Sequence, residues 1–147
     1  MKRIVYTDLD GNLCVIIPAP SWTGTIKELA DKDVPQGLNY KIVNENDIPS
    51  DRTFRGAWVL NAGVISHDMK KAKEIKRNMI REERKLKFTA LDNEINKELV
   101  KAITTEDNSL IVELEGKRKV LRDAPAMPEI ESAETIEDLA VIHLPEV

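Results

Sequence analysis

Two carboxylates at the start of the chain, Asp8 and Asp10, are the residues whose type and spacing could most readily do chemistry. Closely spaced carboxylates occur in catalytic sites, and they occur just as naturally in turns. The chain offers little else of this kind. Cys14 is its only cysteine, and His67 and His143 stand alone, so no Cys/His cluster has the spacing of a zinc site.

The run VYTDLDGNL, which contains Asp8 and Asp10, resembles the first motif of haloacid-dehalogenase-like phosphatases. That resemblance implies a nucleophilic Asp8 and an acid/base Asp10 beside Mg²⁺, at the end of a buried parallel strand. However, Asn12 replaces the usual Thr, and a strand and two prolines follow where a helix should. Turn chemistry alone explains this sequence. We therefore predict a protein that is not an enzyme, with no catalytic, cofactor-binding or metal-ligating residue, and keep the phosphatase as an alternative.

A basic run lies further along the chain, where nine Lys and Arg residues between Lys70 and Lys87 outnumber three Glu. Such a run could bind nucleic acid through phosphate contacts. The cations are spread around the expected helix and no aromatic residues interleave with them for base stacking, which favours a solvated or partner-facing surface. We take five basic residues as interaction candidates: Lys76, Arg77, Arg81, Arg84 and Arg122.

The end of the chain has the opposite charge. From Asp123 onward there are seven acidic residues and no Lys or Arg. If the segment from Glu129 to Asp138 folds back on the helix, it places five carboxylates near the basic run, and between chains it serves as an acidic counterpart of that run. Complementary patches of this kind steer association more than they stabilise a fold. Assembly with itself or with another protein, as a homo- or hetero-oligomer, is the predicted consequence.

Arg52, Phe54, Arg55 and Trp58 form the densest group of large side chains in a chain with only 4% aromatic residues. Arg and aromatic residues are frequent anchors of protein interfaces. The alternative is that Phe54 and Trp58 close a small β lobe as core residues. Both interpretations stay open from the sequence, and all four residues are interaction candidates.

The longest periodic segment runs from Ser66 to Ile103 and contains neither Gly nor Pro. It predicts a single long helix, capped by Ser66 or Asp68, whose charge prevents it from lying inside a core. Its apolar residues recur mostly at steps of three and four. The predicted stripe consists of Ala72, Ile75, Met79, Leu86, Phe88, Leu91, Ile95, Leu99 and Ala102.

Shorter patterns predict the remaining elements. Two β-rich runs around the Asp8 turn indicate a hairpin, and a second hairpin around Asn61-Ala62-Gly63 leads into the long helix. A short helix over 25–30 and a strand over 39–43 lie between them. After the long helix we expect an antiparallel helix over 109–122, with Leu110, Leu114 and Leu121 on one side, and a terminal helix over 133–142.

These elements predict an α+β protein of 147 residues in two parts. Residues 1–65 form a small antiparallel β lobe with a short helix, and residues 66–147 form a long helical hairpin with a short terminal helix. No apolar run approaches the roughly 20 residues that a membrane-spanning helix needs. We expect a soluble chain, made in a reducing compartment, with no membrane partner.

Two segments carry a family resemblance: Ile48 to Trp58 (IPSDRTFRGAW), and the helical pair that includes Ile80-Arg81, Leu91-Asp92 and Leu121-Arg122-Asp123. They resemble small proteins from the tail-gene regions of bacteriophages and prophages, and the helical hairpin is similar to that of phage tail and tail-fibre assembly chaperones. The resemblance implies a structural or assembly role in the virion or, during assembly, in the host cytoplasm. Its implied partners are other tail or tail-fibre proteins, with nucleic acid disfavoured.

Overall fold

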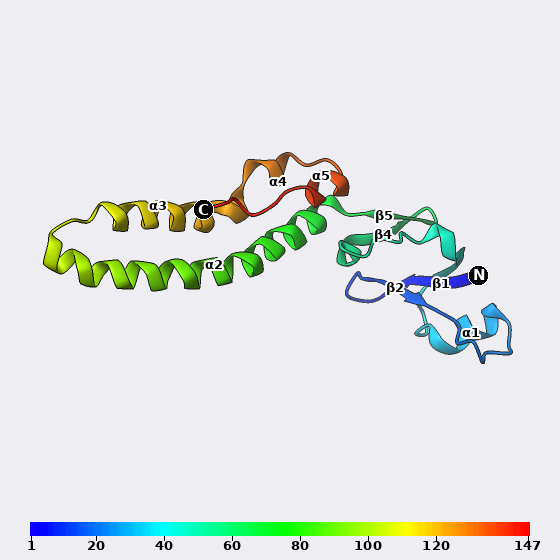
Figure 1. Cartoon of the computed structure of the whole chain (residues 1–147). Helices are drawn as coiled ribbons and strands as arrows, with labels where there is room; N and C mark the ends of the chain where they lie inside the picture. The colour runs from blue at the N-terminus through cyan, green and yellow to red at the C-terminus, as the bar shows by residue number, and fades with distance from the viewer. The chain divides into compact units, whose positions relative to one another are not determined.

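A computed structural model describes all residues from Met1 to Val147 and divides them into two compact units, Met1–Ala72 and Lys73–Val147 (Figure 1). The division falls inside the long helix, seven residues beyond the predicted boundary at 65 (72 − 65). The first turn of that helix is tied to the β-rich unit. The backbone N–H of Asp68 donates to the carbonyl of Ala57, and Lys71 Nζ donates to the carbonyl of Gly11 at 3.2 Å.

The first unit is built on a three-stranded antiparallel sheet of order β2-β1-β3. Its strands are β1 (Lys2–Thr7), β2 (Leu13–Ile16) and β3 (Tyr40–Asn44). The predicted hairpin and third strand are therefore confirmed. Between β2 and β3 lies α1 (Ile26–Asp33), which starts at a capping box. The Thr25 hydroxyl accepts from the Glu28 N–H, and the Glu28 carboxylate accepts from the Thr25 N–H.

The central strand β1 is covered on both faces, because successive side chains of a strand point to opposite sides. Ile4 packs on one side against Leu29 and Ala30 of α1. Val5 packs on the other side in a cluster completed by residues of both sheets: Leu13, Val43, Trp58 and Ile65. Neither Ile4 nor Val5 has any exposed surface. The core of this unit is thus two thin apolar layers that share one strand.

A second, two-stranded antiparallel sheet consists of β4 (Trp58–Asn61) and β5 (Val64–His67). Ala62 and Gly63 form its two-residue turn, both with positive φ, as the turn of a tight hairpin requires. This confirms the second hairpin around Asn61-Ala62-Gly63. Two 3-10 turns, η1 (Glu45–Asp47) and η2 (Arg55–Ala57), lie on the connection from β3.

The predicted long helix is present as α2 (Met69–Thr105), with 37 residues. It begins after Ser66, because Ser66 and His67 belong to β5, and Asp68 provides the N-terminal cap. One Asp68 carboxylate oxygen accepts from the backbone N–H groups of Lys70 and Lys71, at 2.9 and 3.2 Å.

The buried stripe of α2 differs from the predicted one. Its buried residues are Ala72, Lys76, Ile80, Leu91 and Ile95. Two members of the predicted stripe are exposed instead, Leu86 at 82% and Leu99 at 46%. Steps of three and four fit more than one line along a helix of this length, and the partner surface decides which line is covered.

The helix α3 (Ser109–Asp123) returns beside α2 (Figure 1). Leu114 and Leu121 are buried as predicted, whereas Leu110 is 45% exposed. Within the predicted terminal helix over 133–142 the structure has a shorter one, α5 (Ile136–Ala140). It is preceded by a further short helix, α4 (Pro128–Ser132), and by the 3-10 turn η3 (Ala124–Ala126). Thr135 caps α5, since its hydroxyl accepts from the Asp138 N–H.

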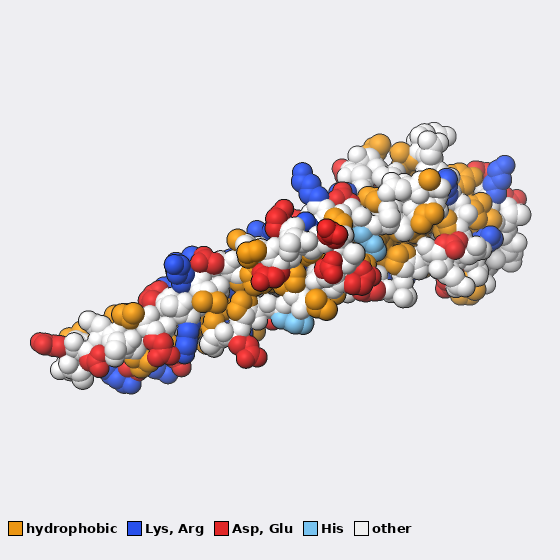
Figure 2. All heavy atoms as spheres, turned by 90° about the horizontal axis from the view of Figure 1, so that it is seen from above, with side chains coloured by type: hydrophobic (Ala, Val, Ile, Leu, Met, Phe, Trp, Pro, Cys, Tyr) orange, Lys and Arg blue, Asp and Glu red, His pale blue; other side chains and the backbone are white.

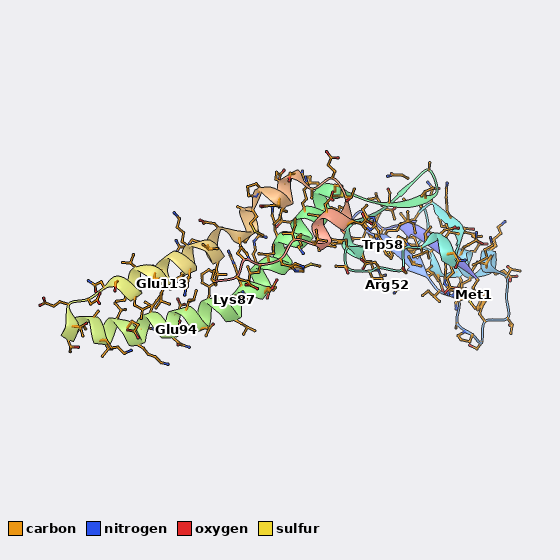
Figure 3. The ribbon with its side chains drawn as sticks, turned by 45° about the horizontal axis from the view of Figure 1, so that its top comes forward. Met1, Arg52, Trp58, Lys87, Glu94 and Glu113 are labelled. Carbon is orange, nitrogen blue, oxygen red and sulfur yellow. The ribbon has the colours of Figure 1, made fainter.

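The terminal segment supplies much of the cover for α2 in the second unit. Buried apolar residues from this segment are Ala124, Ile130, Ala133, Leu139 and Leu144. Near Lys87, labelled in Figure 3, the chain end lies beside the helix, and Lys87 Nζ donates to the Pro145 carbonyl at 3.4 Å. The small antiparallel β lobe followed by the helical hairpin confirms the α+β class. No helix combines the length and apolarity needed to cross a bilayer.

The stripe yields a matched test, because α2 carries one buried and one exposed leucine five residues apart. Leu91→Ala should lower the free energy of unfolding by about 2 to 5 kcal/mol, since Leu91 is only 7% exposed. Leu86→Ala should change it by less than about 0.5 kcal/mol. Urea unfolding of dilute protein, followed by far-UV circular dichroism, measures both. Equal losses would contradict the assignment of the buried face.

Candidate functional site: an arginine-lined pocket

The Asp8 carboxylate organises the β1–β2 turn. Its oxygens accept from the backbone N–H groups of Asp10 and Asn12, at 3.0 and 2.8 Å, and from the Asn12 side-chain amide at 3.1 Å. The Cys14 thiol lies 3.9 Å away as a further donor. Hydrogen bonds from Asn12, chiefly from its backbone, hold the pKa of Asp8 below its ordinary value of 3.8. These contacts match the predicted turn role of Asp8.

Asp10 shares the turn but not the role of Asp8. Its side chain is exposed, and no group of three or more His, Cys, Asp or Glu residues in the chain is arranged to hold a metal ion. The turn joins two antiparallel strands instead of leading from a parallel strand into a helix. The surroundings of Asp8 and Asp10 are therefore those of a hairpin.

The group of Arg52, Phe54, Arg55 and Trp58 is divided by the structure between interior and surface. Phe54 and Trp58 are each only 2% exposed, so the core interpretation holds for them and they offer no surface to a partner. Trp58 Nε1 donates to His67 Nε2 at 3.1 Å across the β4–β5 pair. Arg52 and Arg55 are exposed. Figure 3 labels Arg52 and Trp58 within this unit.

Four of the predicted interaction residues come together in the second unit. Arg77, Arg81 and Arg84 of α2 and Arg122 of α3 line one pocket of about 510 Å³. The lining is completed by Pro125, Ala126, Met127 and Glu131. The steps of four and three between the α2 arginines place them on one helix face. Three of the nine basic residues between Lys70 and Lys87 therefore share this face, and the other six do not line the pocket.

Each α2 arginine of this pocket is held by hydrogen-bond acceptors within the unit. Arg84 Nη1 donates to the carbonyls of Leu121 and Arg122 at 3.0 and 2.7 Å, and its guanidinium lies 5.4 Å from the centre of the Phe88 ring. It thereby neutralises the carbonyl end of α3. Because Arg84 holds this end of α3 against α2, it places Arg122 at the pocket rim.

The two other α2 arginines are positioned by carboxylates. Arg81 Nη1 lies 2.7 Å from a Glu74 carboxylate oxygen, and Arg77 pairs with Glu131 and, at 3.4 Å, with Glu74. Hydrogen bonds from Arg81, and secondarily from Arg77, lower the pKa of Glu74. The contact of Arg77 with Glu131, together with one from Lys73 to the Glu131 carbonyl, is the part of the predicted acidic-to-basic pairing that forms within the chain.

The pocket keeps an excess of positive charge. Four arginines face one lining carboxylate, that of Glu131, and the exposed side chain of Arg122 makes no hydrogen bond or ion pair. A guanidinium that is free of acceptors can bind a carboxylate or a phosphate through two parallel hydrogen bonds. The arrangement is therefore chemically suited to an anionic group from another molecule.

Lys76, the remaining interaction candidate, lies outside this pocket. It is 8% exposed, and desolvation lowers its pKa, with Glu83 acting weakly in the other direction. It occupies the buried stripe between Ala72 and Ile80, where its aliphatic stem packs and its charge is costly. Lys76 is thus a packing residue, and this corrects its assignment to an interaction surface.

Glu74 is the residue of this site that the sequence analysis missed. Glu74 could have been found, because it precedes Arg77 by three and Arg81 by seven residues on one helix face. Glu131 was noted only as one acid among several, and nothing local indicates that it reaches Arg77, 54 residues away. Comparison with family models, with curated proteins and with solved structures finds no match for this chain.

The Asp8 turn predicts a pH dependence of stability. A carboxyl whose pKa is lowered by folding stabilises the folded state above its unfolded pKa, and this stabilisation is lost as the pH falls through the lowered value. Asp8→Asn should therefore be less stable than the native chain at neutral pH, and the difference should shrink as the pH falls below the ordinary value of 3.8. Urea unfolding between about pH 7 and pH 2 measures this difference. A difference independent of pH would contradict the ionic role.

The end of α3 gives a second prediction. Arg84→Ala removes a charged donor from two carbonyls and should cost about 1 to 3 kcal/mol of unfolding free energy. Arg122→Ala is the control, because Arg122 is exposed and unpaired, and it should cost less than about 0.5 kcal/mol. The two variants can be compared by urea unfolding. An Arg84→Ala protein as stable as Arg122→Ala would show that the contact with α3 contributes nothing.

Proposed function

We propose that this chain is a bacteriophage tail-associated structural or assembly protein that acts by binding other proteins rather than by catalysis. The single observation that carries the binding part is the convergence of Arg77, Arg81, Arg84 and Arg122 on one pocket. The tail assignment comes from the sequence resemblance of the segment 48–58 and of the helical pair. The hydrogen-bonded state of Asp8 supports a non-catalytic turn.

The partner surface that fits the pocket is acidic. A carboxylate from an Asp, a Glu or a chain terminus would meet the free guanidinium of Arg122 and the outer nitrogens of Arg81, which is 41% exposed. Arg77 and Arg84 are already committed to Glu131 and to the α3 carbonyls. They would add to the electrostatic attraction of the pocket without forming new hydrogen bonds. We propose that a tail or tail-fibre protein supplies this acidic segment.

Nucleic acid is the second candidate partner, favoured by the same observation because phosphate also suits paired guanidinium groups. The two candidate partners need binding surfaces of different extent. A nucleic-acid surface needs several phosphate contacts along a track, whereas this pocket is a single concavity. No aromatic side chain lines it for base stacking.

The test is co-purification of the tagged chain with the tail proteins produced by the same virus or prophage. We expect a tail component to be retained by the native chain and lost with Arg122→Glu, because the reversed charge repels an acidic partner. Lys119→Glu is the matched control, since Lys119 is also exposed on α3 but does not line the pocket. It should retain the component.

Two results would contradict the proposal. Retention of the same tail component by Arg122→Glu would show that the pocket takes no part in the interaction. Capture of nucleic acid instead of a tail protein, with binding that falls steeply as salt is raised, would favour the accessory role in nucleic-acid binding.

A further inference from the structure

The outward face of α2 carries a regular line of exposed, uncharged residues that the unit leaves uncovered. The line is Leu86, Thr89, Asn93, Asn96, Val100 and Ile103, all exposed. We call it the outer seam. Its steps alternate between three and four residues, which is the spacing of the two core positions of a coiled-coil heptad. Over 18 residues such a line stays on one side of the helix and is about 25 Å long.

The composition of the outer seam sets it apart from the rest of α2. Seventeen of the 37 residues of α2 are charged, yet none of these six is. Its apolar members are among the most exposed of the chain: Leu86 at 82%, Val100 at 68% and Ile103 at 82%. Figure 2 shows hydrophobic side chains among the charged ones along the hairpin. An uncharged line on so charged a helix is typical of a packing surface.

The outer seam is distinct from the surfaces that α2 already uses. The buried residues of the helix end at Ile95, and no residue from 96 to 113 is buried. At 3.6 residues per turn, the seam lies on the side of α2 away from Arg77, Arg81 and Arg84. A surface on that side therefore does not compete with the arginine-lined pocket.

We propose that the outer seam pairs with the same seam of a second copy of this chain, parallel and in register. Asn93 and Asn96 would meet their own counterparts, and buried amides of this kind fix the register of paired helices at some cost in stability. Leu86, Val100 and Ile103 would pack against their equivalents at the two ends. An uncharged seam gives no Coulombic preference for a strongly charged partner, whereas a second copy matches it residue by residue.

The flanking charges specify the direction. In a parallel pair, the residue before one core position contacts the residue five places later in the other chain. Asp92 of each copy thus meets Lys97 of the other, giving two attractive contacts. Asp92 is 46% exposed beside Arg118, so one side of its carboxylate remains open. In an antiparallel pair centred between Asn93 and Asn96, Asp92 would instead face Leu99, and these contacts are lost.

The pairing should have low affinity, because a seam of about 25 Å buries less area than a standard protein interface. It should appear as a reversible, concentration-dependent monomer–dimer equilibrium. The proposal does not depend on the tail assignment or on the arginine-lined pocket, so its failure would leave the proposed function untouched.

Sedimentation of the full chain over a concentration series tests the proposal. The native chain should dimerise, and Val100→Glu should weaken dimerisation at least tenfold by placing two carboxylates in contact. Val112→Glu is the matched control, because Val112 is 70% exposed against 68% for Val100 but lies on α3 outside the seam. It should dimerise as the native chain does. Leu86→Glu, at the other end, should repeat the effect of Val100→Glu, and far-UV circular dichroism checks that each variant is folded.

A native chain that stays monomeric at every concentration would overturn the proposal, as would a dimer that Val100→Glu and Leu86→Glu leave intact. Equal weakening by Val112→Glu would also overturn it.

Disulfide trapping tests the direction of pairing in a Cys14→Ser background, which has no other cysteine. Under mild oxidation, Val100→Cys alone should give cross-linked dimers, and Val112→Cys should not. Cross-links that form only when Leu86→Cys and Ile103→Cys chains are mixed would overturn the parallel arrangement.

Discussion

The structure of the second unit depends on one constraint: a helix of 37 residues, 17 of them charged, has only a narrow line of side chains that it can bury. Burying those charges without a partner is costly, and Lys76 is the only one of them that is buried. The cover must therefore be narrow as well. Leu114 and Leu121 of α3 supply part of it, and Ile130, Leu139 and Leu144 supply the rest. Beyond Ile95 this cover ends, although the helix continues to Thr105.

The same constraint explains where binding capacity lies. On the covered stretch, arginines at the edge of the buried line meet the carbonyl end of α3 and the acidic terminal segment, and their surplus charge collects in the arginine-lined pocket. On the opposite side, the uncharged outer seam is the only regular line of α2 without charge or cover. A protein that acts by assembly would use surfaces of these two kinds, one electrostatic and one apolar.

Local signals of the sequence predicted much of the fold. The Asp8 turn, the tight turn at Asn61-Ala62-Gly63 and the uninterrupted run into α2 each act over a few residues, and each appears in the structure. Predictions that depended on distant partners were less accurate. Leu86 and Ile80 look alike in sequence, yet only Ile80 is buried, because the terminal segment and α3 decide which line of α2 is covered. Periodicity also could not indicate that Lys76 is buried or that Glu131 reaches Arg77. The outer seam, on the stretch of α2 from Leu86 to Ile103, is exposed although its steps of three and four are those of a packing line.

Hydrogen exchange along α2, measured residue by residue in dilute and in concentrated protein, tests most directly the claim that this stretch awaits a second copy. Amides exchange by local opening, and burial of the helix surface slows that opening. The dilute protein should be well protected from Ile80 to Ile95 and progressively less toward Ile103, where no side chain is buried. Concentrating the protein should raise protection from Leu86 to Ile103 and leave α1 unchanged. Protection in that stretch that does not respond to concentration would contradict the account.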